Sequence, residues 1–366
     1  MKIMVGMHHP KQFWIFKNFI LEGRKKGWKF IILVSKKDVI TQLLDANGIG
    51  YIQVGTHKRS TIGQTFEALF YIINSVRYSL KYKPDIFLGR CFPHFAIASK
   101  MSGKPFFVIE DSAGSNQLRR IHKLTFPFIK KIFTPTSYNG DFKEKHIRVP
   151  SYDELLYLHP TWFKPNKDVL RQYGIIPEDK YAILRFVAWT AHHDFGETGI
   201  NLETKKQIIK KLIKAKYKII ISSEDPLEND LAEYQMNITP KDMHHLLAYA
   251  TLFIGDSQTM STESALLGTV SIRSNSFVGT NNDEGNFSEL ENRYKLMYNI
   301  SNSIDIIAKL DELLKIDNIK DIWQAKRNNV LNDKIDYTSF LLWYFETFED
   351  HNYEIDLTQN TFANFK

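Results

Sequence analysis

Residues 252–273 constrain the fold of this chain more than any other stretch. Apolar residues 252–255 predict a strand, and a short polar turn follows. Residues 261–267 predict a helix, which stops at Gly268 before a second apolar strand at 270–273. Strand, helix and strand at this spacing are typical of a parallel β–α–β unit.

The start of that helix also suits a ligand. The first turn of a helix offers backbone N–H groups without intrahelical partners and the positive end of the helix dipole, so it favours a phosphate. Glu263 lies one to two turns further along, where its carboxylate would reach ribose hydroxyls. The pattern indicates a nucleoside diphosphate, and the alternative is an ordinary β–α–β connection with Ser257 as the helix N-cap.

The rest of the chain alternates strand and helix signals. Runs rich in Ile, Val, Leu and Phe predict further strands at residues 2–7, 29–35, 51–54, 86–89, 105–109, 131–134, 181–185 and 218–222. Helical spacing of apolar residues lies between them, for example at 117–129 and 239–250. This alternation predicts an α/β chain with doubly wound parallel sheets.

Domain organisation follows from a proline-rich segment near the middle. Three prolines between residues 150 and 165 predict a hinge. We therefore expect a first domain at residues 1–160, a second at 161–336, and a C-terminal helix and tail at 337–366. Two similar α/β domains would face a cleft, with ligands beyond the carboxyl ends of the strands.

Charge divides the chain unevenly. The first 150 residues carry 25 Lys and Arg against 9 Asp and Glu, a net +16, whereas residues 151–366 carry 23 against 32, a net −9. A basic half suits an anionic membrane, an acidic acceptor or nucleic acid, and the alternative is a solvated surface without a partner. No zinc-finger, helix-turn-helix or aromatic RNA-binding signature occurs, so we do not expect a nucleic-acid partner.

Cysteine and apolar content bear on the compartment. Cys91 is the single cysteine, which excludes an intrachain disulfide and a cysteine-rich metal site. No apolar run approaches the roughly 18 residues of a membrane span, and no signal peptide is evident. We therefore expect a cytoplasmic protein. The segment from Arg119 to Lys131 mixes cations with aromatic residues, which suggests a peripheral contact with the inner membrane face; the alternative is a helix with a basic outer side.

Several segments resemble a known superfamily. The loop and helix at residues 256–268 resemble the donor site of GT-B glycosyltransferases and the matching loop of the non-hydrolysing UDP-GlcNAc 2-epimerases. The start of the chain, with His8-His9-Pro10, and the strand end at 107–111 are similar to a prokaryotic family without an assigned function that is grouped with both. The resemblance covers roughly residues 1–300. It implies the GT-B fold, with two Rossmann-like doubly wound parallel-sheet domains, and a uridine-type nucleotide sugar as substrate.

The resemblance also implies a set of nucleotide-sugar ligands in the second half of the chain. These are Ser257, Gln258 and Thr259 at the diphosphate, Asp256 directly before them, Arg185 assisting at the phosphates, Glu263 at the ribose, and Met243 and His244 near the base. The polar loop that contains Asn282 and Asp283 would contact the donor sugar, and the alternative is a plain surface loop.

Two pairs of residues in the first half are candidate catalytic groups. Glycosyl transfer with inversion needs a base for the acceptor hydroxyl. His8 and His9 follow the first strand, and histidine titrates near neutral pH; the alternative is loop histidines without a role. Glu110 and Asp111 end another strand at the same sheet edge, where they are candidates for the base or for sugar-hydroxyl ligands.

A third pair, His192 and His193, precedes Asp194 in the second half. Imidazole and carboxylate are metal ligands, but adjacent residues rarely point at one ion, and no further cluster completes a set. We therefore predict phosphate or sugar contacts here, no metal, and no cofactor other than the UDP-sugar substrate.

The chain departs from the epimerases in ways that bear on the reaction. Gln258-Thr259 stand where epimerases carry Gly-Gly, and their acidic residue at the fourth strand has no match around Arg90. Glu110 does match an acidic residue of theirs, but Asp111 replaces the small residue beside it. We therefore expect a metal-independent glycosyltransferase of the hexosyl type, with a polysaccharide or glycolipid acceptor. The alternatives are a UDP-sugar 2-epimerase and a small-molecule binding protein.

Overall fold

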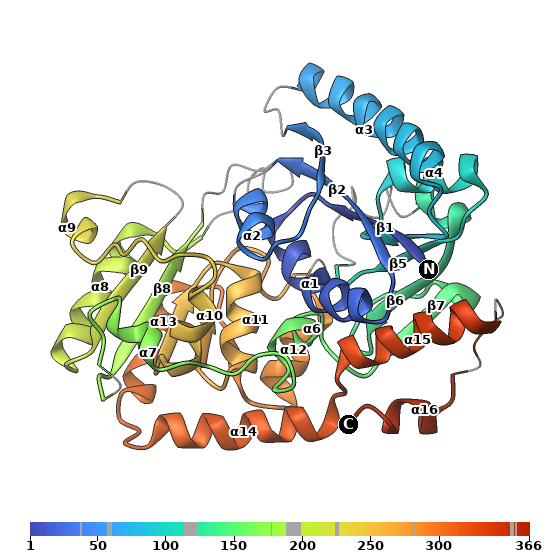
Figure 1. Cartoon of the computed structure of the whole chain (residues 1–366). Helices are drawn as coiled ribbons and strands as arrows, with labels where there is room; N and C mark the ends of the chain where they lie inside the picture. The colour runs from blue at the N-terminus through green and yellow to red at the C-terminus, as the bar shows by residue number, and fades with distance from the viewer. Residues whose placement is uncertain are drawn as a thin grey trace. The chain divides into compact units, whose positions relative to one another are not determined.

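The computed structural model describes residues 1–36, 39–56, 61–112, 123–176, 178–187, 199–223, 227–280, 283–351, 355 and 357–366. The chain divides into two compact units (Figure 1). The first unit combines Met1–Trp162 with Lys334–Lys366, and the second is Phe163–Asp333. The first unit is therefore built from two separate stretches of chain and the second from one.

A seven-stranded parallel sheet forms the centre of the first unit, in the order β3-β2-β1-β4-β5-β6-β7. The strands are β1 (Lys2–Met7), β2 (Lys29–Lys36), β3 (Ile52–Thr56), β4 (Ile86–Gly89), β5 (Phe106–Ile109), β6 (Ile129–Pro135) and β7 (His146–Val149). Strand residues such as Ile3–Val5 and Phe106–Ile109 are wholly buried, as expected for a parallel sheet that is covered on both faces.

The helices of the first unit cover the two faces of this sheet. They are α1 (Pro10–Lys25), α2 (Ile40–Ala46), α3 (Thr61–Tyr82), α4 (Pro93–Ser102), α6 (Leu155–Leu158), α15 (Tyr337–His351) and α16 (Gln359–Ala363), with short 3-10 turns η1 (Phe126–Phe128) and η2 (Lys143–Lys145). Strand order runs outward from β1 to β3 and then returns to β4. Because such crossovers are right-handed, α1 and α2 lie on one face and α3 and α4 on the other.

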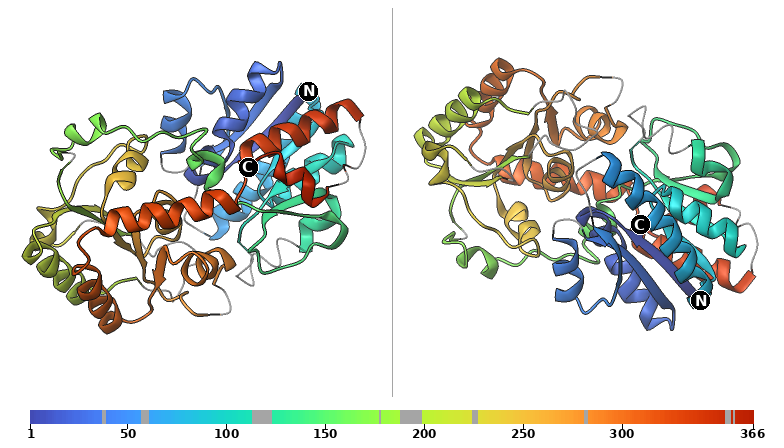
Figure 2. Two further views of the ribbon diagram at one scale, coloured as in Figure 1. Left: turned by 90° about the horizontal axis from the view of Figure 1, so that it is seen from below. Right: turned by 90° about the horizontal axis from the view of Figure 1, so that it is seen from above.

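Helix α15 belongs to the core of the first unit although it comes from the far end of the chain. The ring of Phe107 on β5 lies 5.0 Å from that of Phe345, and the ring of Phe133 on β6 lies 4.9 Å from that of Tyr344. Figure 2 shows α15, in red, along the strands that carry these rings. Residues 334–366 thus complete the apolar layer on this face of the sheet.

The second unit has a five-stranded parallel sheet in the order β12-β11-β10-β8-β9. Its strands are β8 (Tyr181–Phe186), β9 (Lys218–Ser223), β10 (Leu252–Gly255), β11 (Val270–Arg273) and β12 (Met297–Asn299). Its helices are α7 (Asp168–Arg171), α8 (Leu202–Lys214), α9 (Asn229–Ala232), α10 (Met243–Tyr249), α11 (Gln258–Leu266), α12 (Gly285–Asn292), α13 (Ser303–Leu313) and α14 (Ile319–Asp333).

Helix α14 fixes the C-terminal end of α11. Arg327 Nε donates to the carbonyl of Leu266 at 2.7 Å, and Gln324 Nε2 donates to that of Leu267 at 2.9 Å, so these side chains satisfy carbonyls that have no intrahelical partner. Gly268 has φ +75°, and a Cβ there would lie 2.5 Å from Gln324 Nε2. Glycine is therefore required where the sequence predicted the helix to stop.

The α/β class with parallel sheets is confirmed, and the ten predicted strands are present. Two strands were missed, β7 and β12. The helix predicted at 239–250 begins only at Met243, because Thr239 Oγ1 donates to Asp242 Oδ2 at 2.5 Å and closes a turn before it. The helix predicted to reach residue 129 was also wrong at its end, since Ile129 already pairs with Phe106 in the sheet. The start of that helix lies outside the described residues.

The proline-rich segment at 150–165 is largely packed into the first unit. Ser151 Oγ donates to the carbonyl of Ile335 at 2.9 Å. The carbonyl of Leu156 accepts from Asn18 Nδ2 at 2.9 Å and from Thr338 Oγ1 at 2.7 Å. These bonds tie helix α6 to both stretches of chain that make up the unit.

Candidate functional site

In the second unit, the candidate site begins where β10 ends. Gly255 closes the strand, and a Cβ at this position would lie 2.6 Å from the carbonyl oxygen of Arg185 on β8, so only glycine fits. Asp256 is buried, and its Oδ1 accepts from the backbone N–H of Val187 at 2.9 Å. Asn275 Nδ2 donates to the Asp256 carbonyl at 3.0 Å. Asp256 therefore joins the carboxyl ends of β8 and β10, directly before α11.

Helix α11 starts at this edge with an open first turn. Ser257 is its N-cap, with Oγ accepting from the N–H of Met260 at 3.4 Å. Residues 257–260 are half-buried, whereas 261–266 are buried. The first helical N–H groups have no intrahelical acceptor, and the positive end of the dipole lies with them. Gln258 and Thr259, both predicted diphosphate ligands, stand in this first turn.

Two residues predicted from sequence for the nucleoside lie together. His244 Nε2 is 3.1 Å from Glu263 Oε1, and both side chains are 5% exposed. Their pairing brings the predicted base and ribose positions to one point of the fold. The ring of Phe163 lies edge-on to His244, at 5.9 Å between centroids, and is half-buried. Met243 is the first residue of α10 and is also half-buried.

The remaining candidates of the second unit fall into two groups. Arg185 stands on β8, where its guanidinium donates to Ser222 Oγ at 2.9 Å. Asp283 pairs with Arg273, a wholly buried arginine at the end of β11, at 2.6 Å between Oδ1 and the guanidinium. This pair anchors the loop, and a sugar contact of Asp283 stays a prediction. His192, His193 and Asn282 lie outside the described residues.

In the first unit, His8 and His9 have different surroundings. His9 is exposed and is the N-cap of α1, its Nδ1 accepting from the N–H of Lys11 at 3.1 Å. His8 is half-buried, and its Nε2 lies 3.1 Å from Nε2 of His94 on α4. At this distance one ring donates a proton that the other accepts. Burial, with a contribution from His8, holds the pKa of His94 well below 6.5, so His94 is neutral at neutral pH.

The ring of His8 also sits among aromatic side chains. The centroid of Tyr71 is 4.9 Å away, and that of Phe92 is 4.5 Å away, both in edge contacts. Tyr71 Oη is 2.5 Å from Ser35 Oγ and donates to Glu67 Oε1 at 2.9 Å. Burial raises the pKa of the Tyr71 phenol. His8 is therefore held in one orientation at the carboxyl edge of the sheet.

Glu110 and Asp111 lie at the same edge but inside an ion-pair network. Lys11 Nζ is 2.6 Å from Asp111 Oδ2 and 2.9 Å from Glu154 Oε1. Arg90 pairs with Asp111, lies 3.5 Å from Glu110 Oε1, and is 2.7 Å from an Oδ of Asp153. Six charged side chains, four of them acidic, thus meet where β4, β5 and the segment after β7 end.

Burial and charge act differently on the acids of this network. Burial alone would raise the pKa of Asp111, but Arg90 and Lys11 outweigh it and hold that pKa well below its ordinary value. Burial, with the negative charge of Asp111, raises the pKa of Asp153 well above its ordinary value, and burial also raises that of Glu154. Asp111 is therefore ionised at neutral pH. Asp153 and Glu154, whose pKa values are raised, are the acids of the network that bind a proton more readily.

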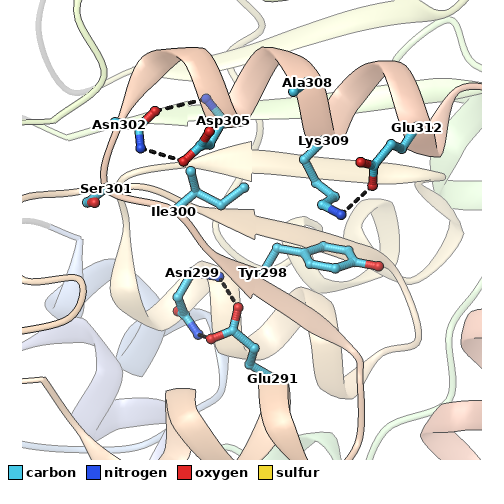
Figure 3. A pocket seen from close by; sticks show the side chains of 10 residues that line it. All are labelled: Glu291, Tyr298, Asn299, Ile300, Ser301, Asn302, Asp305, Ala308, Lys309 and Glu312. Atoms are coloured by element: carbon cyan, nitrogen blue, oxygen red, sulfur yellow. Dashed lines mark hydrogen bonds and ion pairs between the residues drawn. The ribbon is translucent and has the colours of Figure 1, made fainter.

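A separate pocket of about 350 Å³ lies beside β12 and α13 (Figure 3). None of the residues predicted from sequence lines it. Its charged side chains are engaged with neighbours: Glu291 accepts from Asn299 Nδ2 at 3.0 Å, and Asp305 accepts from the side chain of Asn302 at 2.5 Å. Lys309 pairs with Glu312 on the same helix. These charged side chains of the pocket therefore already have partners within the protein.

The parts of the chain that the structure describes contain no cluster of His, Cys, Asp and Glu with the arrangement of a metal site. None of their helices has the length and apolarity that crossing a bilayer requires.

Sequence reasoning missed several residues of these sites, among them Lys11, Arg90, His94, Asp153, Glu154 and Phe163. In the sequence, Arg90 stands out only as a mismatch to an acidic position. Lys11 carried a usable signal, since a lysine at the second position of a helix that follows the first strand lies at the carboxyl edge of the sheet. His94 and Phe163 gave none, because only tertiary packing brings them to His8 and His244.

These two units together have the GT-B fold, as comparison with solved structures shows. A candidate UDP-N-acetylglucosamine 2-epimerase from Listeria monocytogenes is 14% identical, with a TM-score of 0.71, over 98% of this chain and 99% of that one. The UDP-GlcNAc 2-epimerase from Neisseria meningitidis, bound to UDP-GlcNAc, is 15% identical with a TM-score of 0.61, over 90% and 98%. The glycosyltransferase VinC, in complex with dTDP, is 10% identical with a TM-score of 0.62, over 96% and 100%.

At these identities the likeness defines the fold and leaves the reaction open. No protein-family model and no curated protein sequence matches the chain. The expected similarity to a prokaryotic family without an assigned function therefore stays a prediction.

Proposed function

We propose that the protein is a glycosyltransferase that uses a nucleotide-sugar donor, UDP-linked, and transfers the sugar to a hydroxyl of a polysaccharide or glycolipid. The observation that carries this proposal is the start of α11. Its half-exposed first turn, at the carboxyl edge of a parallel sheet, presents backbone N–H groups that favour a diphosphate.

The pair His244 and Glu263 supports a nucleoside next to that diphosphate. Glu263 is two turns along α11 from Ser257, and its Oε1 is fixed by His244 at 3.1 Å. A carboxylate held in this way is a suitable acceptor for ribose hydroxyls, because its orientation needs no further ordering on binding. The half-buried ring of Phe163 beside His244 supplies an apolar surface for a base. Two of the solved structures with a similar fold are complexes with UDP-GlcNAc and with UDP, which favours uridine.

His8 is the proposed base. The acceptor hydroxyl gives its proton to the imidazole as its oxygen bonds to the anomeric carbon, and the bond from that carbon to the phosphate oxygen breaks. The diphosphate leaves with the electron pair, and its charge is stabilised by the N–H groups of the first turn of α11. His94, neutral and 3.1 Å from His8, fixes the imidazole in one tautomer.

Asp111 and Glu110 are weaker candidates for the base. Asp111 is engaged by both Lys11 and Arg90, and its low pKa makes it a poor proton acceptor. Glu110 is buried beside Arg90. We therefore propose that the two acids support the framework of the first unit and that His8 takes part in the chemistry.

A UDP-sugar 2-epimerase is the second candidate. The observation that favours it is the TM-score to three structures named as UDP-N-acetylglucosamine 2-epimerases, which is 0.61 to 0.71, against 0.58 to 0.63 for four glycosyltransferases. An epimerase needs no acceptor and releases no UDP, so the two reactions separate cleanly.

The test uses the full chain with a panel of nucleotides and UDP-sugars. Binding to the folded state raises the melting temperature by mass action, so we expect a selective shift with UDP and with at least one UDP-sugar. Incubation with that UDP-sugar, water standing in for the acceptor, should release UDP slowly. Proton NMR that instead shows a C2 epimer without UDP release would replace the transferase by the epimerase. Binding without either reaction would favour a binding protein.

His8→Ala provides the matched variant. It should lose UDP release by at least about a hundredfold, the usual contribution of a general base, while UDP binding is retained. His9→Ala, which removes an exposed imidazole from the neighbouring position, is the control and should keep UDP release. Equal activity of both variants would remove His8 from the mechanism.

A further inference from the structure

Helix α3 of the first unit buries polar side chains and exposes apolar ones. Its buried side chains include Glu67, Asn74, Ser75 and Ser79, which are between 0% and 8% exposed. A helix on the face of a parallel sheet normally buries an apolar stripe and exposes polar residues. In α3, half-buried Tyr71, Val76 and Tyr78 supply the inward apolar contacts in place of a full stripe. The apolar residues that such a stripe would use lie elsewhere on the helix.

Those apolar residues face outward. Leu69, Phe70, Ile73 and Leu80 are each between 53% and 57% exposed. At about 100° per residue, Leu69, Ile73 and Leu80 fall within an arc of about 40°, and Phe70 lies about 60° beyond it. Seen from above in Figure 2, α3 lies along the outside of the first unit, in blue. The four side chains therefore form one continuous outward stripe, here called the α3 stripe.

An exposed apolar stripe of this kind indicates a binding partner. Single exposed apolar residues are ordinary, but contiguous exposed apolar surface marks a place where a protein meets a partner or a membrane. The second unit offers a contrast, since the exposed large apolar residues among those described there, Ile176, Ile213 and Ile304, come from three different segments. The α3 stripe thus calls for a specific occupant.

The charges around the α3 stripe indicate which occupant fits. Exposed cations accompany it on α3, on the adjacent α4 and in the turns that follow them: Arg77, Lys81, Lys83, Lys100 and Lys104. Within residues 61–82 and 93–102 the one acidic residue is Glu67, which is buried. Asp85 in the turn after α3 is also exposed, and its Oδ2 accepts from the N–H of Lys2 at 2.7 Å. The face therefore combines apolar side chains with a net positive charge.

We propose that the α3 stripe docks on an anionic lipid surface. Leu69, Phe70, Ile73 and Leu80 would enter the boundary between head groups and acyl chains, and Arg77 and Lys81 would lie at the head groups. Apolar burial and cation attraction together give the two signals that stable peripheral binding requires. This contact lies on a different segment from the one between Arg119 and Lys131 that the sequence suggested.

A second copy of the chain is a poorer occupant. In a two-fold dimer the same face meets itself, so the cations of both copies, Arg77 and Lys81 among them, would enter one interface in which α3 offers no exposed acidic residue. Like charges at an interface oppose association. An anionic bilayer has the opposite sign to this face and suits it.

The experiment is sedimentation of the full chain with phospholipid vesicles of two compositions. One contains phosphatidylcholine alone, and the other also contains about 30% phosphatidylglycerol, which supplies the negative surface potential. We expect sedimentation with the anionic vesicles only, and release when the salt concentration is raised. No sedimentation with either composition would overturn the proposal.

Two sets of variants separate the contributions. Leu69→Ser with Ile73→Ser should reduce partitioning by at least about tenfold, because both side chains leave the bilayer boundary. Arg77→Gln with Lys81→Gln should reduce it by about fivefold per cation. Ile304→Ser removes a comparably exposed apolar side chain from the second unit and should leave partitioning unchanged. All of these positions are exposed, so the melting temperature should not move.

Light scattering of the free protein covers the remaining alternative. A monomer, or a dimer that persists in Leu69→Ser with Ile73→Ser, is expected. A dimer that this double substitution converts to monomer would assign the α3 stripe to self-association and overturn the lipid proposal.

Discussion

The carboxyl edges of the two parallel sheets are built on opposite plans. At the edge of the first sheet, Arg90 and Lys11 are surrounded by four acidic side chains, so both cations are held in ion pairs inside the protein. At the edge of the second, the turn from Gly255 to Thr259 offers small polar side chains and backbone N–H groups.

The difference fits the two tasks that the proposed function gives to these edges, which are holding the diphosphate and positioning the base. Backbone donors at a helix start receive an anion without any ion pair having to break, which suits the diphosphate proposed for the second edge. Breaking one partner out of a buried ion pair costs several kcal/mol, about 3–5, because the other charge is left unpaired. The network therefore keeps the first edge rigid, and His8 lies at this rigid edge. Four changes test this contrast.

Arg90→Met should have the largest effect. It removes the cation that faces Glu110, Asp111 and Asp153, and removal of one partner from a buried ion pair typically costs about 3–5 kcal/mol. The measurement is the free energy of unfolding in urea. Lys26→Met is the control, because Lys26 pairs with Glu346 in solvent and should change stability by less than about 1 kcal/mol. Equal losses in the two variants would mean that the first edge is not a closed network.

Thr259→Glu should weaken anion binding at the second edge. A carboxylate at the second position of α11 would favour the helix dipole but repel a diphosphate, so UDP affinity should fall by at least about tenfold. Calorimetry with UDP and with uridine reads the difference, since uridine binding should be retained. Ile304→Glu, at the matching position of α13, is the control. Unchanged UDP affinity in Thr259→Glu would place the phosphates elsewhere.

Glu263→Gln should have a smaller effect that depends on the sugar of the nucleotide. The amide keeps the shape beside His244 but loses the negative charge, and a hydrogen bond to a charged group contributes about 1.5–3 kcal/mol. We expect UDP to bind at least about tenfold more weakly, and the preference for UDP over 2′-deoxy-UDP to shrink. Glu291→Gln, on the pocket of Figure 3, should leave both unchanged. The same UDP affinity in Glu263→Gln would show that the ribose assignment is wrong.

His94→Gln should change the pH dependence of stability in the first unit. Burial holds the folded-state pKa of His94 well below its unfolded value of 6.5, so below pH 6.5 the unfolded chain binds a proton that the folded protein does not. Wild type should therefore lose stability with acidification, by at most about 1.4 kcal/mol per pH unit from this group. The advantage of wild type over His94→Gln should shrink between about pH 7 and about pH 5.

Urea unfolding at several pH values measures that difference. His9→Gln, which alters an exposed imidazole, should run parallel to wild type. Parallel curves for His94→Gln as well would contradict a neutral, buried His94.

Much of the fold could be predicted because its signals are local. Continuous apolar runs that end in polar residues mark buried parallel strands, and Gly268 marks the end of α11 by its positive φ. Strands β7 and β12 escaped because each is short and only part of it is buried, so its residues carry no apolar run. The turn at 239–242 escaped because side-chain bonds with Tyr173 and Asp242 decide it.

The candidate sites were predictable to a lesser degree, for a related reason. Residues next to a strand end, such as His8, Asp111 and Ser257, could be placed at the sheet edge from sequence. Their partners could not, since Arg90 and Asp153 are 63 positions apart and meet only once β4 and the segment after β7 share an edge. Whether a carboxylate is open or paired depends on such partners, and the sequence alone does not show that Arg90 and Lys11 pair with Asp111.

The return of the chain to its first unit has a consequence for biosynthesis. On the ribosome, residues 163–333 emerge as one uninterrupted stretch and hold every strand of their sheet, whereas the aromatic face formed by Phe107 and Phe133 waits for Tyr344 and Phe345. The half that is translated first is therefore the half that finishes last. During that interval its exposed aromatic surface is a binding site for a chaperone. A premature stop after residue 333 would leave this surface without the side chains of Tyr344 and Phe345 that cover it.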